Sequence, residues 1–229
     1  VYFLIEEFGS KGVNISLPSL RIDAFALDVM SKVQDIRKSS LTFAPEAGTQ
    51  RLRDAINKGL SEESILKGAT DAFMLGWNKV KLYFMMGLPT ETDEDIVGIA
   101  ELAQRILDLY YSIENRPKGR SPQISVSCAT FVPKPFTPFQ FEPQDTREEI
   151  ERKQKLLLDS VKSKKIKVSY HDADVSQLEA VLAKGDRRLC NVVYTAWKMG
   201  CKFDSWSEHF KFDVWLEAFE KCGEIGRAS

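Results

Sequence analysis

The first two thirds of the chain alternate between short apolar runs with strand character and longer segments with helical periodicity. Strands are predicted at residues 13–17, 40–44, 79–86 and 123–131. Each is followed by a turn or by a segment whose apolar residues recur every three or four positions. One helix is predicted from Thr49 with apolar residues as far as Leu60, a second is capped by Ser61, and a third starts at a capping box of Thr92 and Asp95. A repeated strand–helix unit specifies a parallel sheet, because each helix returns the chain so that the next strand runs in the same direction. The sequence therefore predicts an α/β fold, either part of a barrel or a small open sheet.

The number of units limits this fold. A complete (β/α)8 barrel takes about 250 residues, whereas the chain has 229 and its four predicted units end near residue 141. We therefore expect a partial barrel over residues 1–143, followed by a mostly helical extension over residues 144–229. The chain starts with VYFLIEEF, without an initiator methionine and with the apolar spacing of a helix end. This start predicts that the chain is a fragment.

The extension contains several signals for helix starts and one short apolar run at residues 165–170. Capping boxes are predicted at Thr146–Glu149 and Ser176–Glu179, a cap at Asp186, and a last helix from Ser205 and Glu208. Helical spacing predicts a buried stripe in the helix after Asp186, made of Leu189, Val192, Val193, Ala196 and Trp197. The nearby aromatic residues predict a small core, made of Trp197, Phe203, Trp206, Phe210 and Trp215.

Composition excludes several classes of protein. The 32 Lys and Arg against 33 Asp and Glu give a formal charge of -1, which excludes a strongly basic nucleic-acid binder but not a local basic groove. The cysteines form no CxxC or CxxxC pair, so they predict no metal or iron–sulfur nest; they are Cys128, Cys190, Cys201 and Cys222. This sparse cysteine usage favours a reducing compartment, and we expect a cytoplasmic protein. No apolar run or leader predicts a membrane partner.

The segments that follow the strands are the places to look for a site, because ligands of parallel α/β folds bind at the carboxyl ends of strands. Arg21 follows the first strand and could clamp a carboxylate, or pair with a neighbour such as Asp23. After the second strand, Glu46 could accept hydrogen bonds from hydroxyls or an ammonium, Gly48 allows close backbone approach, and Thr49 starts a helix. An ordinary helix cap with an exposed Glu46 is the alternative.

The other two loops are less specific. Gly87, Leu88 and Pro89 follow the third strand, where Gly87 would expose backbone groups to a planar ligand and Pro89 would stiffen the turn. The fourth strand ends in residues 131–139, where three prolines and three phenylalanines suit the wall of a cavity. A stiff crossover to the C-terminal part explains that composition equally well.

Three of these segments together resemble the second half of the radical S-adenosylmethionine (SAM) superfamily. APEAGTQRLRDAINKG resembles the ribose-contacting segment after the fourth barrel strand, KVKLYFMMGLPTETDEDI the segment of the fifth strand, and FVPKPFTPFQ that of the sixth. Within the superfamily, the chain is most similar to uncharacterised proteins with an upstream cobalamin-binding domain. YHDADVSQLEAVLAKGDRRL and GCKFDSWSEHF are similar to that subgroup as well.

The resemblance implies roles for particular residues. Glu46 would contact SAM, and Gly48 and Thr49 would line its ribose. The segment Gly87, Leu88 and Pro89 would lie near the adenine, and Arg21 is a candidate for the SAM carboxylate. The resemblance implies SAM and a 4Fe–4S cluster as cofactors, an electron donor as partner, and an unknown small-molecule or RNA substrate. The reaction would be reductive SAM cleavage to a 5′-deoxyadenosyl radical, or methyl transfer with cobalamin.

The chain also departs from the family pattern. The cluster motif CxxxCxxC and the Gly-Gly-Glu segment are absent, and Ala47 replaces the usual serine. We therefore expect the cluster ligands upstream, no metal ligand in this chain, and an inactive fragment of an oxidoreductase or transferase. No catalytic acid or base is predicted. Two other readings stay open: a phosphate-binding α/β barrel fragment, and a non-catalytic module associated with RNA or protein.

Overall fold

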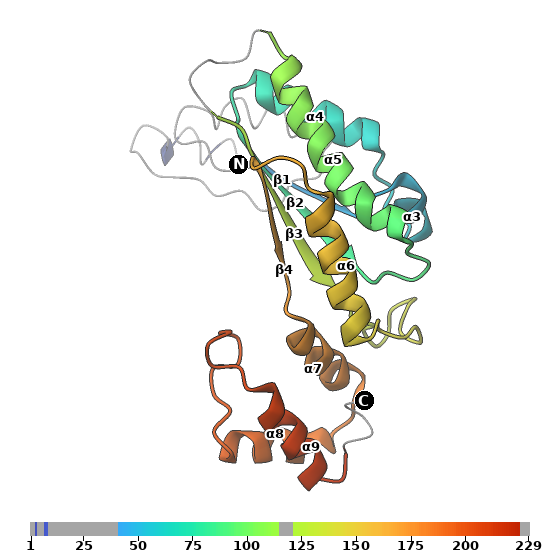
Figure 1. Ribbon diagram of the computed structural model, residues 1–229, viewed down its shortest axis with the longest axis vertical. Helices are drawn as coiled ribbons and strands as arrows, with labels where there is room; N and C mark the ends of the chain where they lie inside the picture. The colour runs from blue at the N-terminus through green and yellow to red at the C-terminus, as the bar shows by residue number, and fades with distance from the viewer. Residues whose placement is uncertain (1–2, 4–6, 9–40, 115–120, 225–229) are drawn as a thin grey trace. The chain divides into compact units, whose positions relative to one another are not determined.

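The computed structural model describes residues 3, 7–8, 41–114 and 121–224 of the chain (Figure 1). Both Arg21 and the strand predicted at residues 13–17 lie outside these residues. Contacts divide the chain into two compact units, which we call unit 1 and unit 2. Unit 1 comprises residues 1–129 and 152–170, and unit 2 comprises residues 130–151 and 171–229. The boundary expected near residues 142–146 falls inside the sequence range of unit 2.

A four-stranded parallel sheet with alternating helices forms the centre of unit 1, in keeping with the predicted α/β class. Three of its strands lie at predicted positions, whereas the fourth is the short apolar run at residues 166–170, which the sequence pattern places in the helical extension. Its strand order is β1-β2-β3-β4, and β1–β2 and β3–β4 pair in parallel. The strands are β1 (Leu41–Glu46), β2 (Lys79–Met86), β3 (Gln123–Thr130) and β4 (Ile166–Tyr170). The helices are α3 (Gln50–Ala55), α4 (Glu62–Met74), α5 (Asp93–Ser112) and α6 (Arg147–Ser160). Because β1 and β2 are parallel neighbours, their carboxyl ends lie at the same end of the sheet (Figure 1).

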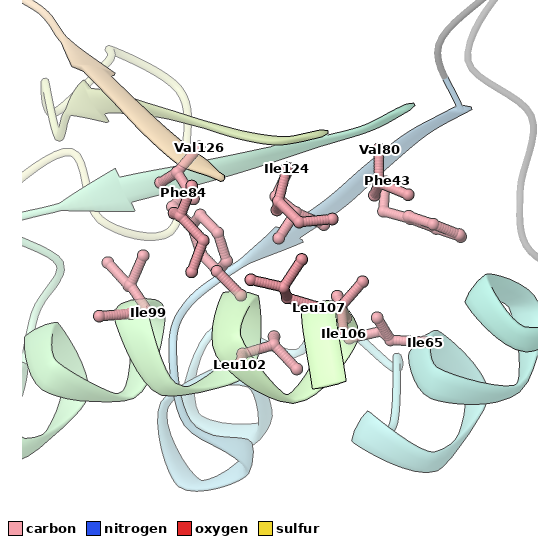
Figure 2. Close-up of a cluster of buried hydrophobic side chains, with 14 of the residues drawn as sticks. Phe43, Ile65, Val80, Phe84, Ile99, Leu102, Ile106, Leu107, Ile124 and Val126 are labelled. Carbon is pink, nitrogen blue, oxygen red and sulfur yellow. The ribbon is translucent and has the colours of Figure 1, made fainter. Parts of the chain in front are cut away.

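One face of the sheet packs against helices. Burial alternates along β2 and β3, so every second residue points into the core. Figure 2 shows Val80, Phe84 and Val126 on the strand side of this core, with Ile99 and Leu102 of α5 opposite them. Burying apolar surface is the main favourable term in folding, and this layer therefore fixes α5 against the strands that carry the loops of the site.

The helix starts in unit 1 follow the predicted caps. Ser61 accepts a 3.1 Å hydrogen bond from the Ser64 N–H at the start of α4. Thr92 and Asp95 form the predicted capping box at the start of α5. The first helix is shorter than expected, since α3 ends at Ala55. The chain then enters the left-handed region twice, with φ 54° at Asn57 and 62° at Gly59, which a continuing helix does not allow.

Unit 2 contains three helices among the described residues, α7 (Ala173–Lys184), α8 (Leu189–Lys198) and α9 (Phe212–Lys221). Two predicted starts are wrong. Helix α7 begins before Ser176, because Asp172 caps it by accepting the Val175 N–H at 3.1 Å. Helix α9 begins only at Phe212, after a turn-rich segment that contains Ser205. The predicted cap Asp186 instead holds Arg188, the residue before α8, through its carboxylate.

The predicted aromatic core of unit 2 is wrong for most of its members. The core contains Leu189, Val192 and Ala196 of α8 with Trp215 of α9. In contrast, the exposed fractions are 44% for Val193, 53% for Trp197, 72% for Phe203 and 62% for Trp206. An amphipathic helix buries only the stripe that meets its neighbours, here residues of α7 and α9, and the flanking apolar residues stay in solvent.

Candidate functional site

Two loops meet at the carboxyl edge of the sheet in unit 1. The first loop, residues 46–49, follows β1, and the second loop, residues 87–92, follows β2. Because β1 and β2 are parallel neighbours, both loops emerge at the edge where parallel α/β folds bind ligands. These loops contain every predicted site residue that the structure describes: Glu46, Gly48, Thr49, Gly87, Leu88 and Pro89.

Asp95, at the start of α5, ties the two loops together. Its carboxylate accepts hydrogen bonds from the Thr49 hydroxyl and from the Arg51 guanidinium. It also accepts the Thr92 N–H at 2.8 Å and the Thr92 hydroxyl at 3.1 Å. Arg51 in turn donates to the Thr90 carbonyl at 2.9 Å. One buried carboxylate thus holds the start of α3 against the second loop.

These contacts change the acidity of Asp95. Burial raises its pKa, but the hydrogen bonds from Thr49, Thr92 and Arg51 lower it further, so the pKa lies below its ordinary value. A lowered pKa means that the folded state prefers the ionised carboxylate. Its contribution to stability is therefore complete above the ordinary aspartate pKa of about 3.9, and is lost as the pH falls through the lower folded value.

Asp95→Asn is expected to lower the free energy of unfolding by about 1–3 kcal/mol at neutral pH, because it removes a charged acceptor from buried donors. Urea unfolding of both proteins between pH 7 and pH 3 measures this, and the difference should shrink on the acid side. The matched control is Asp93→Asn in the same helical turn, whose carboxylate meets Arg152 at the exposed surface and should matter much less. A difference that is constant across the pH range would contradict this role for Asp95.

Gly48 lets the first loop touch the backbone of α5. A Cβ at this position would lie 2.1 Å from the Asp95 carbonyl oxygen and 2.4 Å from the Ile99 nitrogen. Gly98 faces it from α5, where a Cβ would lie 3.1 Å from the Gly48 carbonyl carbon. The close approach predicted for Gly48 therefore occurs in the structure between the loop and a helix of the same unit.

Glu46 ends β1 in a strained conformation. Its φ is 67°, in the left-handed region, and the pairing register with β2 shifts between Phe43 and Glu46. Its Oε1 accepts a 3.0 Å hydrogen bond from Lys58 Nζ, and both side chains are about one quarter to one third exposed. The strand thus ends at a residue whose carboxylate is paired with Lys58.

Arg53 supports the first loop from beneath. Its side chain is fully buried, and its guanidinium donates to the Ala47 carbonyl at 2.9 Å and to Gln50 Oε1 at 3.2 Å. Burial lowers its pKa, which Glu62 and Asp54 partly offset. Nε has no hydrogen-bond partner among the described residues. A buried cation that grips a loop carbonyl restricts where that loop can move.

The second loop is fixed by a buried ion pair. Gly87, at φ 86°, donates its N–H to Glu91 Oε1 at 2.7 Å. The same oxygen lies 2.9 Å from Lys153 Nζ of α6, with exposed fractions of 2% for the Glu91 and 7% for the Lys153 side chain. Leu88 is buried, and Thr90 has φ 69°. The loop therefore presents a defined backbone at the carboxyl end of β2.

The cysteines do not form a metal site. In the part of the chain that the structure describes, no three His, Cys, Asp or Glu side chains gather as metal ligands do. Cys128 is buried on β3, and burial together with the charge of Glu91 raises the pKa of its thiol to about 12. Cys201 is buried in unit 2, and Cys190 is exposed.

The phenylalanine-rich segment after β3 belongs to unit 2 from residue 130 onwards. Phe131 is buried and meets the Phe139 ring edge to face at a centroid distance of 6.2 Å. Phe136 is 98% exposed at φ 63°, with its N–H bonded to Gln140 Oε1 at 3.2 Å. Hydrogen bonds within the segment hold its turns. Its role as a cavity wall stays a prediction.

Sequence reasoning missed four residues that hold the loops. Asp95 was recognised only as a helix cap, although a capping box next to a ligand loop is a usable signal. Arg53, Glu91 and Lys153 carry no such signal, because charged side chains at these positions are ordinarily exposed. The roles predicted for Glu46, Gly48, Thr49 and the second loop in binding a cofactor stay predictions, as does that of Arg21.

The fold and the two loops define the class: a parallel α/β protein in which the loops after β1 and β2 meet at the carboxyl ends of these strands. Comparison with known families then points to one superfamily. Residues 2–103 match the model of the Radical SAM superfamily. This match covers 102 of the 229 residues and shows that this part of the chain is similar to the superfamily.

A curated relative extends the similarity into the C-terminal part. It is the uncharacterized protein MJ0966 of Methanocaldococcus jannaschii, 35% identical over 178 residues. The aligned part is 78% of this chain but 36% of the relative, so the chain spans about a third of the relative's length. No solved structure matches the chain. None of the helices described here has both the length and the apolarity of a membrane span.

Proposed function

We propose that unit 1 supplies the later strands of a radical SAM enzyme and contacts the adenosyl part of SAM through its two loops. One observation carries this proposal. Both loops that resemble SAM-binding segments of the superfamily emerge at the same edge of a parallel sheet, where the Asp95 carboxylate joins them. A site assembled from two loops needs such a tie, because a misplacement of about 1 Å weakens catalysis and binding.

The residues of the two loops fit the polar and planar parts of SAM. The Glu46 carboxylate can accept hydrogen bonds from ribose hydroxyls or from an ammonium. The backbone of Gly87, Leu88 and Pro89 offers peptide groups to the adenine edge, and Gly87 has no side chain to block a planar ring. The Thr49 hydroxyl, which donates to Asp95, orders the ribose side of the first loop in this proposal.

The residues described here do not fit an iron–sulfur cluster. The buried Cys128 and Cys201 lie in different units, and the described residues hold no three-ligand group. In radical SAM enzymes the reduced 4Fe–4S cluster supplies the electron that cleaves SAM, and the protein positions the cofactors. We therefore propose that the cluster ligands belong to other parts of a longer protein, and that this chain alone does not cleave SAM.

The finer features of the reaction follow from this assignment as proposals. The longer protein would use SAM to form a 5′-deoxyadenosyl radical, or combine it with cobalamin for methyl transfer. An external one-electron donor would be needed, because the chemistry consumes an electron for each SAM that is reductively cleaved. The substrate class is not defined by the residues of the two loops.

Titration of the chain with SAM, followed by saturation-transfer NMR, tests the proposal. We expect saturation transfer to the adenine and ribose protons of SAM, and competition by 5′-deoxyadenosine. Glu46→Gln should weaken binding about tenfold, since it removes a charged hydrogen-bond acceptor. Glu63→Gln, in the exposed first turn of α4, is the matched control and should bind as the parent chain does. Displacement by inorganic phosphate but not by 5′-deoxyadenosine would instead favour a phosphate-binding barrel and overturn the proposal.

A further inference from the structure

Unit 2 displays an aromatic surface that the apolar pattern of the sequence places in a core. Tyr194, Trp197, Phe203 and Trp206 are all more than half exposed. We call these four residues, with Lys198 and Lys202, the aromatic–lysine patch. Monomeric proteins rarely expose contiguous apolar surface of this kind without a binding partner.

Ring stacking, cation–π contacts and a hydrogen bond connect members of the patch. The Tyr194 and Trp197 rings are stacked, with centroids 5.9 Å apart and an interplanar angle of 22°. Lys198 Nζ lies 4.5 Å from the Tyr194 ring centroid, and Lys202 Nζ lies 5.9 Å from that of Trp197. Phe203 adjoins Lys202 in the chain, and its carbonyl accepts the Trp206 N–H at 2.9 Å. The patch therefore runs from the last turns of α8 into the following turn.

The patch carries a local excess of positive charge. Phe203 has φ 61°, in the left-handed region that an aromatic residue rarely adopts. Residues 186–211 contain five Arg and Lys against three Asp and Glu, although the whole chain has a net charge of -1. Within the described residues, neither Lys198 nor Lys202 has an ion-pair partner.

A further basic side chain lies close to α8 in the chain. Arg187 is exposed in the turn that precedes the helix, two residues before Leu189. Asp204, the acidic residue inside the patch, is engaged because its Oδ1 accepts the Trp215 Nε1–H at 3.4 Å. This surface thus combines the cations of Lys198 and Lys202 with exposed aromatic rings, while the Asp204 carboxylate is engaged by Trp215.

We propose that the aromatic–lysine patch binds single-stranded nucleic acid, with bases stacking on the aromatic rings and phosphates meeting Lys198, Lys202 and Arg187. Stacking surfaces interleaved with cations are the pattern that single strands require, because every base has a π face and every nucleotide a negative charge. A protein partner fits less well, since the centres of protein interfaces are depleted in lysine. This inference rests on unit 2 alone and is independent of the SAM proposal for unit 1.

Fluorescence anisotropy of a labelled oligouridylate of about a dozen nucleotides, titrated with the chain at low salt, tests the inference. We expect saturable binding that quenches tryptophan emission, because Trp197 and Trp206 are exposed whereas Trp77 and Trp215 are buried. Trp197→Ala combined with Trp206→Ala should weaken binding about tenfold or more. Tyr111→Ala, which removes an exposed aromatic residue from α5 in unit 1, is the matched control and should leave binding unchanged.

The charge part of the inference has its own variant. Lys198→Gln combined with Lys202→Gln should reduce the slope of log affinity against log salt by about 1.4, because each phosphate contact to a single strand contributes about 0.7. Absence of binding at low salt overturns the inference. It is also overturned if the double tryptophan variant binds like the parent chain, or if a duplex of equal length binds as tightly as the single strand. Tryptophan quenching that depends on the concentration of the chain but not on added oligonucleotide would indicate that the patch binds a second copy of the chain. That result would also overturn the inference.

Discussion

Gly48→Ala is expected to lower the free energy of unfolding of unit 1 by about 3 kcal/mol or more. The added Cβ would lie 2.1 Å from the Asp95 carbonyl oxygen and 2.4 Å from the Ile99 nitrogen, and both are backbone atoms of α5. A flexible side chain could turn away, but a helix backbone cannot, so the loop and α5 must separate. Overpacking of a close contact ordinarily lowers the free energy of unfolding by about 1–3 kcal/mol. We expect the upper end of this range or more, because the added Cβ meets backbone atoms. Urea unfolding followed by far-ultraviolet circular dichroism measures the loss.

Gly59→Ala is the matched control for this substitution. Gly59 has φ 62°, and nothing lies within 4 Å of the position its Cβ would occupy. Alanine there bears only the cost of the left-handed backbone, about 1 kcal/mol. Equal losses for the two variants would contradict the tight packing of the first loop on α5. Since Gly48 lies in a proposed cofactor loop, SAM binding should also be lost in the Gly48 variant at temperatures where the chain still folds.

Lys153→Met is expected to lower the free energy of unfolding by about 3–5 kcal/mol. The substitution leaves the Glu91 carboxylate buried without its cation, and the cost of an unpaired buried charge exceeds that of the lost pair itself. The two side chains are nearly inaccessible, and their charged atoms lie 2.9 Å apart. Chemical unfolding of the variant, compared with the parent chain, measures the change.

The double variant Lys153→Met with Glu91→Gln separates this explanation from simple loss of packing. Glutamine keeps an oxygen for the Gly87 N–H, which Glu91 accepts at 2.7 Å, but carries no charge to be left unpaired. Much of the stability should therefore return. Arg152→Met, the neighbouring control, breaks an exposed pair with Asp93 and should change stability little. A double variant less stable than Lys153→Met alone would contradict the charge argument.

The sequence predicted those features that depend on local pattern. The positions of β2 and β3, the cap at Ser61 and the capping box of Thr92 and Asp95 each involve residues close in the chain. The sites that escaped prediction depend on residues far apart. Lys153 reaches Glu91 from a helix 62 positions later in the sequence numbering, and no local pattern distinguishes it from an exposed lysine.

The aromatic residues of unit 2 illustrate a different failure. Helical spacing predicted that Val193 and Trp197 would be buried with Val192 and Ala196, because all four fall on one broad side of α8. Only the stripe that meets α9 and residues of α7 is covered in the structure. How much of an apolar helix face is buried depends on the number of neighbours, which the spacing of residues in one helix does not contain.

Amide NMR of the chain with and without SAM is the most direct test of whether the loops after β1 and β2 bind SAM. We expect saturating SAM to shift the resonances of residues 46–49 and 87–91 and to leave those of α8 and α9 unchanged. Glu46→Gln should diminish the shifts in both loops together, because Asp95 couples them. Shifts confined to other elements, or none at millimolar SAM, would contradict the claim that these two loops form a SAM-binding edge.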